Sequence, residues 1–112
     1  MASPQLENGY TRIANEILEH LAFPGITGSG FRLIIFVMRK TYGYGKKKDK
    51  ISLSQFQKGT LMKRSQIVRT IKEVVSKRIL LKEKNVYGIN KNWEEWVVSK
   101  RVPPVHKRLM PS

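Results

Sequence analysis

Apolar residues recur at helical spacing near the start and in the middle of the chain. Residues 10–22 carry one apolar stripe, which predicts an amphipathic helix and consists of Ile13, Ile17, Leu18 and Leu21. The apolar run at 33–38 could, on its pattern alone, be a buried strand. It lies, however, in a stretch of about twelve residues between glycine-rich breaks, and its flanks continue the helical spacing. We therefore predict a helix over residues 31–42 that packs on more than one side.

Two further helices are predicted in the second half of the chain. Residues 51–53 have the pattern of a short strand, and Ser54 and Gln57 have the spacing of a capping box, in which each side chain bonds a backbone N–H. This predicts a short helix over residues 55–59. After a turn, residues 63–77 form a longer helix with the buried stripe Ile67, Ile71, Val74 and Val75. Two helices joined by a tight turn, the second basic on its outer face, are typical of a helix-turn-helix.

A β-hairpin completes the predicted fold. Residues 79–83 and 86–90 are β-prone and flank the polar turn Lys84-Asn85. The order of helix, helix-turn-helix and hairpin predicts an α+β fold that is mainly α. We interpret it as a winged helix-turn-helix with the short β-hairpin as its wing.

The same pattern divides the chain into three parts. Residues 1–9 are polar and predict an extended N-terminal arm, and residues 10–98 are predicted to form one winged-helix domain, the candidate binding domain. Residues 99–112 are rich in proline and basic residues and predict a basic flexible tail. Trp93 and Trp96, close to the end of the domain, are expected to cap its core rather than to stack on bases.

Charge is distributed unevenly along the chain and changes the picture. The 112 residues hold 22 Lys and Arg against 8 Asp and Glu, for a net charge of +14. Residues 1–31 have a net charge of −2, because they contain one base and three acids, so the rest of the chain carries +16. A field of this strength attracts polyanions such as DNA, RNA or anionic lipid. In the alternative interpretation, the lysines only keep the protein in solution.

The outer face of the predicted helix 63–77 carries the side chains best suited to DNA. Arginine can make two hydrogen bonds to guanine, glutamine can make two to adenine, and the first residues of a recognition helix lie close to base edges. The candidate base-reading residues are therefore Arg64, Ser65, Gln66 and Arg69. The candidate phosphate contacts, which fix the register without reading sequence, are Lys63, Lys72, Lys46, Lys47, Lys48, Lys50 and Lys84. For the segment 43–50, expected to be an exposed basic loop, a purely solvated turn remains an alternative.

Catalytic and metal-binding patterns are absent from the sequence. The chain contains no cysteine, which excludes disulfides and a thiol nucleophile and favours a reducing, intracellular compartment. It has no metal-ligand spacing and no P-loop, and its longest apolar run is far too short to span a bilayer. We therefore expect no enzymatic activity, no cofactor, no metal and no membrane partner.

The sequence resembles the N-terminal, origin-binding domain of phage replication protein O. The resemblance is carried by SPQLENGYTRIANEILEHLA at 3–22, FRLIIFVMRKTYGYGKKKDKISLSQ at 31–55, RSQIVRTIKEVVSKRIL at 64–80 and YGINKNWEEW at 87–96. It implies a winged helix that binds repeated double-stranded sites at a replication origin, in the cytoplasm of a bacterial host. It also implies a homodimer, for which the acidic first helix or the arm before it would supply the surface. A helicase or helicase loader would be engaged only through a region absent from this chain.

Two turns depart from that family. The turn before helix 63–77 commonly reads Gly-Leu-Ser, whereas this chain has Leu61-Met62-Lys63, and a glycine usual after the helix is replaced by Arg78. Without the serine, we expect a less tightly capped helix, at a cost of about 1 kcal/mol. Because a fold does not determine function, two alternatives remain open: a winged-helix transcription regulator and a protein-interaction adaptor.

Overall fold

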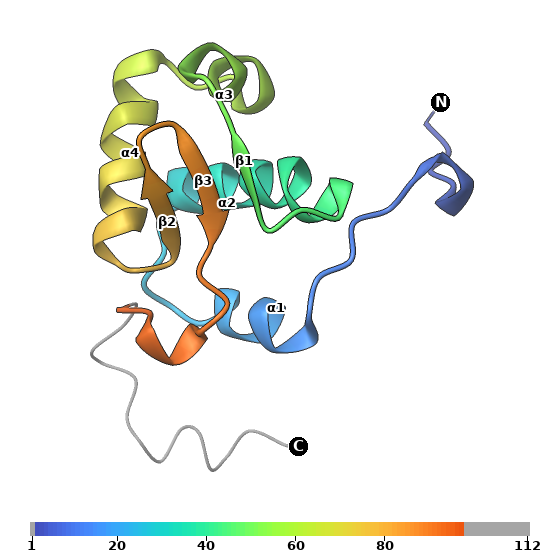
Figure 1. The fold of residues 1–112 in the computed structure, drawn as a ribbon, viewed down its shortest axis with the longest axis horizontal. Helices are drawn as coiled ribbons and strands as arrows, with labels where there is room; N and C mark the ends of the chain where they lie inside the picture. The colour runs from blue at the N-terminus through green and yellow to red at the C-terminus, as the bar shows by residue number, and fades with distance from the viewer. Residues whose placement is uncertain (1, 98–112) are drawn as a thin grey trace.

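The computed structural model describes residues 2–97, and the tail predicted at 99–112 lies outside them. The described chain is α+β and mainly helical, as predicted, with four α-helices and a three-stranded antiparallel sheet in the order β1-β3-β2 (Figure 1). The helices and strands are, in chain order, α1 (Asn15–Leu21), α2 (Gly28–Lys40), β1 (Lys48–Lys50), α3 (Leu53–Thr60), α4 (Arg64–Ser76), β2 (Leu80–Glu83) and β3 (Val86–Ile89). The described chain also contains three short 3-10 helices: η1 (Leu6–Asn8) before α1, η2 (Tyr42–Tyr44) between α2 and β1, and η3 (Trp93–Glu95) after β3.

Helix α2 lies at the centre of the core. Helices α3 and α4 and strand β3 all contact it, and the side chains of Leu33, Ile34 and Val37 are fully buried. Packing on several sides explains the apolar residues of the run 33–38 except Ile35, which is 61% exposed. The prediction of a central helix rather than a buried strand is confirmed.

The first two helices begin at other residues than the pattern predicts. Helix α2 begins three residues early, because the Thr27 hydroxyl accepts a hydrogen bond from the Gly30 N–H at 3.1 Å and so caps the helix. Helix α1 begins five residues late, at Asn15, because Ala14 has extended backbone with φ −61° and ψ 138°. The arm and the segment that follows it therefore extend away from the body of the molecule (Figure 1).

The capping box predicted at Ser54 and Gln57 is wrong by two residues. The Ser52 hydroxyl accepts a hydrogen bond from the Gln55 backbone N–H at 3.2 Å. The Gln55 side-chain oxygen Oε1 in turn accepts one from the Ser52 backbone N–H at 2.8 Å. Helix α3 therefore begins directly after Ser52, and the strand predicted at 51–53 is not formed. Both serine–glutamine pairs have the same spacing, so the pattern alone does not choose between them.

Strand β1 lies in the segment predicted to be an exposed loop, which corrects that expectation. Lys48 pairs with Gly88, and Lys50 pairs with Val86. A side-chain carbon at Gly88 would lie 2.7 Å from the Lys47 carbonyl oxygen, so only glycine lets β1 approach β3 this closely. Since β1 contains no apolar residue, its strand conformation depends on its partner, and no hydrophobic pattern reveals it.

Helix α4 and the hairpin are confirmed. Helix α4 is one residue shorter at each end than the predicted helix 63–77. It buries Ile67, Ile71 and Val74, as the stripe predicts, while Val75 is only half-buried. Strands β2 and β3 pair on either side of the predicted turn at 84–85.

The two tryptophans cap the core, as expected. Trp96 is buried, and its indole N–H donates to the Asn90 carbonyl oxygen at 2.8 Å. The Trp93 ring stacks on His20 with 3.8 Å between ring centroids, which joins η3 to α1. Trp96 is therefore closed to bases, and one face of the Trp93 ring is already occupied by His20.

Both turns that flank α4 hold a side chain in the left-handed region. Leu61, which is 86% exposed, has φ 59°, and Arg78 has φ 60°. A left-handed conformation costs an ordinary residue about 1–2 kcal/mol, which is why glycine is usual at such turns. No side chain caps α4 at Lys63, in agreement with the expectation of weak capping.

Replacing Gly59 with Ala should lower the free energy of unfolding by about 1–3 kcal/mol, the usual cost of overpacking a core. Helix α3 passes so close to α2 that a side-chain carbon at Gly59 would overlap the Phe36 ring. Urea unfolding followed by circular dichroism measures the change. The matched control is Gly28→Ala, where a new side-chain carbon has no neighbour within 4 Å. Equal stabilities of the two variants would contradict this packing.

A second prediction concerns high pH. The Tyr42 hydroxyl is buried without a hydrogen-bond partner among the described residues, and burial raises the pKa of this phenol. In the unfolded chain Tyr42 therefore ionises at about pH 10, whereas in the folded chain it keeps its proton to higher pH. The folded state thus binds more protons than the unfolded state above that pH, so the free energy of unfolding falls as the pH rises further. Tyr42→Phe should show less loss of unfolding free energy between about pH 7 and 10.5. The exposed Tyr44→Phe serves as the control and should behave as wild type.

Candidate nucleic-acid interface

The outer face of α4 presents an exposed set of basic and polar side chains. Because Ile67, Ile71 and Val74 turn one side of the helix into the core, the opposite side faces solvent. The sequence-predicted residues exposed here are Arg64, Ser65, Arg69 and Lys72 along α4, together with Lys63 at its N-cap. We call these five residues the α4 basic face.

Polar contacts near the far end of α4 set its orientation on the rest of the fold. The Thr27 hydroxyl donates to a Glu73 carboxylate oxygen at 3.2 Å, which ties α4 to the start of α2. Lys77 forms an ion pair with Glu73 at 3.0 Å and also donates to the Gly25 carbonyl oxygen at 2.6 Å. The contacts with Thr27 and Gly25 could not be predicted, because these partners lie 46 and 52 positions away, whereas the Glu73–Lys77 pair has the i,i+4 spacing of a helix ion pair and could have been found.

Arg32 supports the other end of α4 through the preceding turn. Its guanidinium donates to the Thr60 carbonyl oxygen at 2.5 Å and so satisfies an acceptor at the C-terminus of α3. The Thr60 hydroxyl accepts from the Met62 N–H at 3.3 Å, within the same turn. The turn that carries Leu61 in its left-handed conformation is therefore stabilised by a side chain of α2 and by a hydrogen bond within the turn.

Gln66 is placed differently from the other predicted base-reading residues. Its side chain is half-buried, and its amide nitrogen donates to the Ser29 hydroxyl at 2.8 Å. Gln66 thus faces α2, whereas Arg64, Ser65 and Arg69 face solvent. In the free protein its amide N–H₂ is engaged within the fold.

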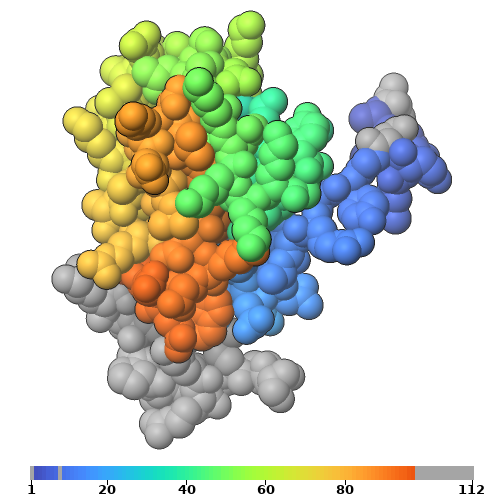
Figure 2. Space-filling view, in the orientation of Figure 1, coloured from blue at the N-terminus to red at the C-terminus, as the bar shows by residue number. Residues whose placement is uncertain are grey.

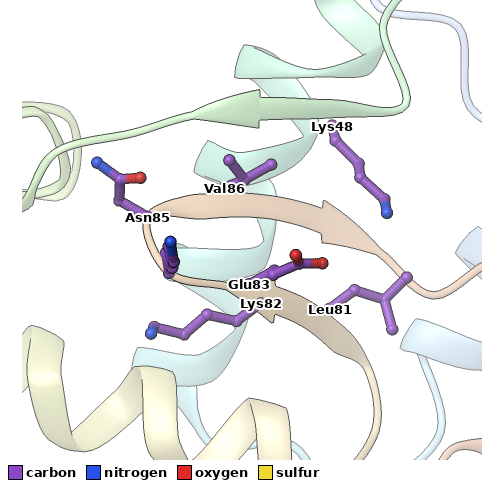
Figure 3. A pocket seen from close by; sticks show the side chains of 7 residues that line it. Lys48, Leu81, Lys82, Glu83, Asn85 and Val86 are labelled. Atoms are coloured by element: carbon purple, nitrogen blue, oxygen red, sulfur yellow. The ribbon is translucent and has the colours of Figure 1, made fainter.

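The hairpin supplies a second group of exposed lysines. Lys84 occupies its turn with φ 57°, and Lys82 is exposed beside it although the sequence analysis did not select it. A hollow of about 510 Å³ borders the hairpin, and Figure 3 shows Lys48 reaching its rim from β1 while Lys82, Glu83 and Asn85 come from the hairpin. Strand alternation would place Lys82 on the face of the buried Leu80, so only its charge beside the hairpin turn could have pointed to it.

The structure brings some of the predicted lysines together and separates others. The Ile51 N–H donates to the Asn85 carbonyl oxygen at 2.9 Å, so the hairpin turn is tied to the segment that leads into α3. In Figure 1 this turn lies at the same end of the molecule as the N-terminal half of α4. Lys50 lies near that end because it pairs with Val86. Lys46 and Lys47 precede β1 and lie beyond its other end, about 10 Å or more away at strand spacing.

The α4 basic face has no acidic partners. Among residues 2–97 there are two ion pairs, Lys77–Glu73 and Lys46–Asp49, and the second is long, at 3.7 Å. Neither involves the α4 basic face or the lysines of the hairpin. The first turn of α4 also contains no acid, so its positive dipole end is not neutralised locally. The arrangement suits binding to a polyanion.

The described part of the chain offers little for metal or membrane chemistry. Residues 2–97 contain no group of three or more His, Cys, Asp or Glu side chains that could hold a metal ion. Of the helices in that range, none has the length and apolarity needed to cross a membrane.

Comparison with known proteins identifies relatives along most of the chain. A family model described as bacteriophage replication protein O matches residues 3–96. The chain is 37% identical over 92 residues to DNA replication protein gp18 of Salmonella phage P22, covering 82% of this chain and 34% of that protein. It is 31% identical over 93 residues to replication protein O of Escherichia phage lambda, covering 83% and 28% respectively.

The matches cover most of this chain but only part of each relative. A third relative, replication protein 15 of Enterobacteria phage phi80, is 25% identical over 99 residues, covering 85% of this chain and 33% of that protein. The chain thus spans about a third of the length of the curated relatives it matches. No solved structure matches it significantly. Since the family model covers nearly all the described residues, the chain belongs to the bacteriophage replication protein O family.

Proposed function

We propose that this chain is a sequence-specific double-stranded DNA-binding module that recognises a phage or prophage replication origin and has no catalytic activity. The observation that carries the proposal is the α4 basic face, exposed and free of acidic partners, in a chain of the replication protein O family. In this interpretation α3 and α4 are the helix-turn-helix, and β2 and β3 are the wing of a winged helix. The names of two relatives, DNA replication protein and replication protein O, support a role in phage DNA replication.

In the proposed complex, α4 enters the major groove with its N-terminal half. Arg64, Ser65 and Arg69 then face base edges, where an arginine can bond both guanine acceptors. Lys63 and Lys72, at either side of them, contact phosphates and fix the register. Gln66 reads a base only if it exchanges Ser29 for an adenine edge, so its role depends on DNA competing with an internal hydrogen bond.

The lysines of the sheet contact the DNA backbone beside the groove. Lys84 and Lys50 lie at the same end of the molecule as the start of α4, and Lys48 borders the hollow next to the hairpin. Lys46 and Lys47 reach phosphates only farther along the duplex. Together these contacts supply sequence-independent affinity that depends on salt.

The proposal includes partners outside the described residues. The relatives are about three times as long as the matched region, and we propose that a helicase or its loader is engaged through that further region, in the cytoplasm of the bacterial host. We also propose that the chain binds DNA as a homodimer. A transcription regulator would use the same basic face, so the replication proteins among the relatives favour the initiator. A protein-interaction adaptor is less compatible with a face made of unpaired cations.

Titration of labelled duplexes at several salt concentrations tests DNA binding. If about six phosphates are neutralised, log K should fall with log salt with a slope of roughly −5. Arg69→Ala should weaken binding to origin repeats by about 1–3 kcal/mol and leave binding to random duplex nearly unchanged. Arg12→Ala, which removes the same charge from the segment before α1, is the matched control. Equal losses on all sequences would make Arg69 a phosphate contact, and salt-independent or absent binding would refute the proposal.

A double-mutant cycle separates the structural and DNA-reading roles of Gln66. Ser29→Ala and Gln66→Ala should each lower the unfolding free energy by about 0.5–1.5 kcal/mol, because each removes one side of their hydrogen bond. The double variant should lose less than the sum of the two. Urea unfolding measures the cycle, and duplex titration of Ser29→Ala measures the second role. If Gln66 reads a base, Ser29→Ala should bind origin DNA at least as well as wild type.

A further inference from the structure

A groove between α1 and α2 leaves apolar side chains uncovered. It has a volume of about 430 Å³, and its floor is formed by Leu18, Leu21, Phe31, Ile35 and Met38. Ile35 is 61% exposed and Leu18 is 48% exposed. A cavity of about 150 Å³ already holds a benzene ring, so the groove has room for a large apolar side chain with its neighbouring backbone. No residue of α4 or of the hairpin lines it.

The N-terminal arm carries an apolar side chain that is mostly exposed to solvent. Figures 1 and 2 show the arm projecting from the body of the molecule. Leu6, in η1, is 77% exposed. In the described structure the arm's hydrogen bonds stay within it, from Gln5 to the Ser3 hydroxyl at 3.4 Å and from the Gly9 N–H to the Leu6 carbonyl oxygen at 3.0 Å. The arm is therefore an exposed segment that does not cover its own chain's groove.

Charge indicates that the arm and the groove belong together. The arm carries Glu7 as its acid, and the groove is bordered by Arg39. Each copy carries most of its +14 charge after residue 31, so a contact made through residues 1–31 keeps the strongly positive parts of the two copies apart. A contact between the arm and the groove uses that segment and leaves the α4 basic face of each copy free.

We propose that in the homodimer the arm of each copy lies in the α1–α2 groove of the other, with Leu6 on the apolar floor and Glu7 next to Arg39. This inference rests on the homodimer proposed above and names the segment that holds it. Exchange between two copies makes two equivalent contacts from one pair of complementary surfaces, as a closed two-fold dimer requires. A second copy thereby supplies the cover that the groove lacks in the single chain.

Directed disulfide formation tests the exchange, since the chain contains no cysteine of its own. A chain with Leu6→Cys is mixed with a chain with Ile35→Cys, oxidised and separated on a non-reducing gel. The expected result is a cross-linked dimer of the two different chains. The matched control replaces Ile35→Cys by Leu61→Cys, a more exposed position outside the groove, and should cross-link at least tenfold less. Equal cross-linking of both pairs would overturn the proposal.

A chain carrying both Leu6→Cys and Ile35→Cys tests where the arm goes. Exchange predicts disulfide-linked dimers, whereas an arm that closes its own groove gives an oxidised monomer and overturns the proposal. Sedimentation of Leu6→Asp or Ile35→Asp should show a dimer dissociation constant raised at least tenfold. A mixture of the two should recover part of the association, because one intact arm and one intact groove remain.

These outcomes distinguish the two levels of the proposal. A dimer that keeps its affinity after Leu6→Asp overturns the exchange and leaves the homodimer standing. A wild-type chain that stays monomeric at all concentrations overturns both. Duplex DNA binding is measured separately on a single half-site, where Leu6→Asp should leave the affinity within about twofold of wild type. A wild-type chain that fails to bind the half-site would therefore contradict the DNA-binding proposal and not the arm exchange.

Discussion

The burial of the inner face of helix α2 is the constraint on which the rest of this structure depends. Leu33, Ile34 and Val37 have no exposed surface, and helices α3 and α4 and strand β3 pack around them. Burying side chains of this size contributes about 1.5–3 kcal/mol each, which fixes α2 as the common support. Every element proposed to touch DNA is positioned by its contact with that helix or with its neighbours.

Polar contacts then turn a packed helix into an oriented one. Apolar packing alone is non-directional, so it does not decide how far α4 is rotated or shifted along α2. The contacts of Glu73 with Thr27, of Lys77 with the Gly25 carbonyl oxygen and of Gln66 with Ser29 remove that freedom. Because they are made on the inner side of α4, the cations on its outer side remain available.

Sequence pattern predicted the elements that bury apolar stripes and missed those that do not. Helices α2 and α4 were predicted because their apolar residues have the helical period, and the hairpin was predicted because two β-prone runs flank a polar turn. Strand β1 was missed because its three residues are all polar, and it pairs only because Gly88 admits it. The start of α3 was misplaced because two serine–glutamine pairs share one spacing. The candidate site follows the same rule, since the α4 basic face is the complement of a buried stripe, whereas the inward orientation of Gln66 depends on a residue 37 positions away.

By itself, the sequence determined that this chain is a mainly helical α+β domain, that its positive charge lies after residue 31, and that its kinship is with replication protein O. The fold class and the charge distribution are local or compositional, so periodicity and residue counts are sufficient to establish them, whereas the kinship rests on the resemblance of whole sequence segments and on the family match. Only the tertiary structure decided which cations share an end of the molecule, that Lys46 and Lys47 lie apart from the hairpin turn, and that an apolar groove stays uncovered beside a projecting arm. Such properties depend on which distant segments meet, and that is set by the burial of α2 and the few polar contacts around it.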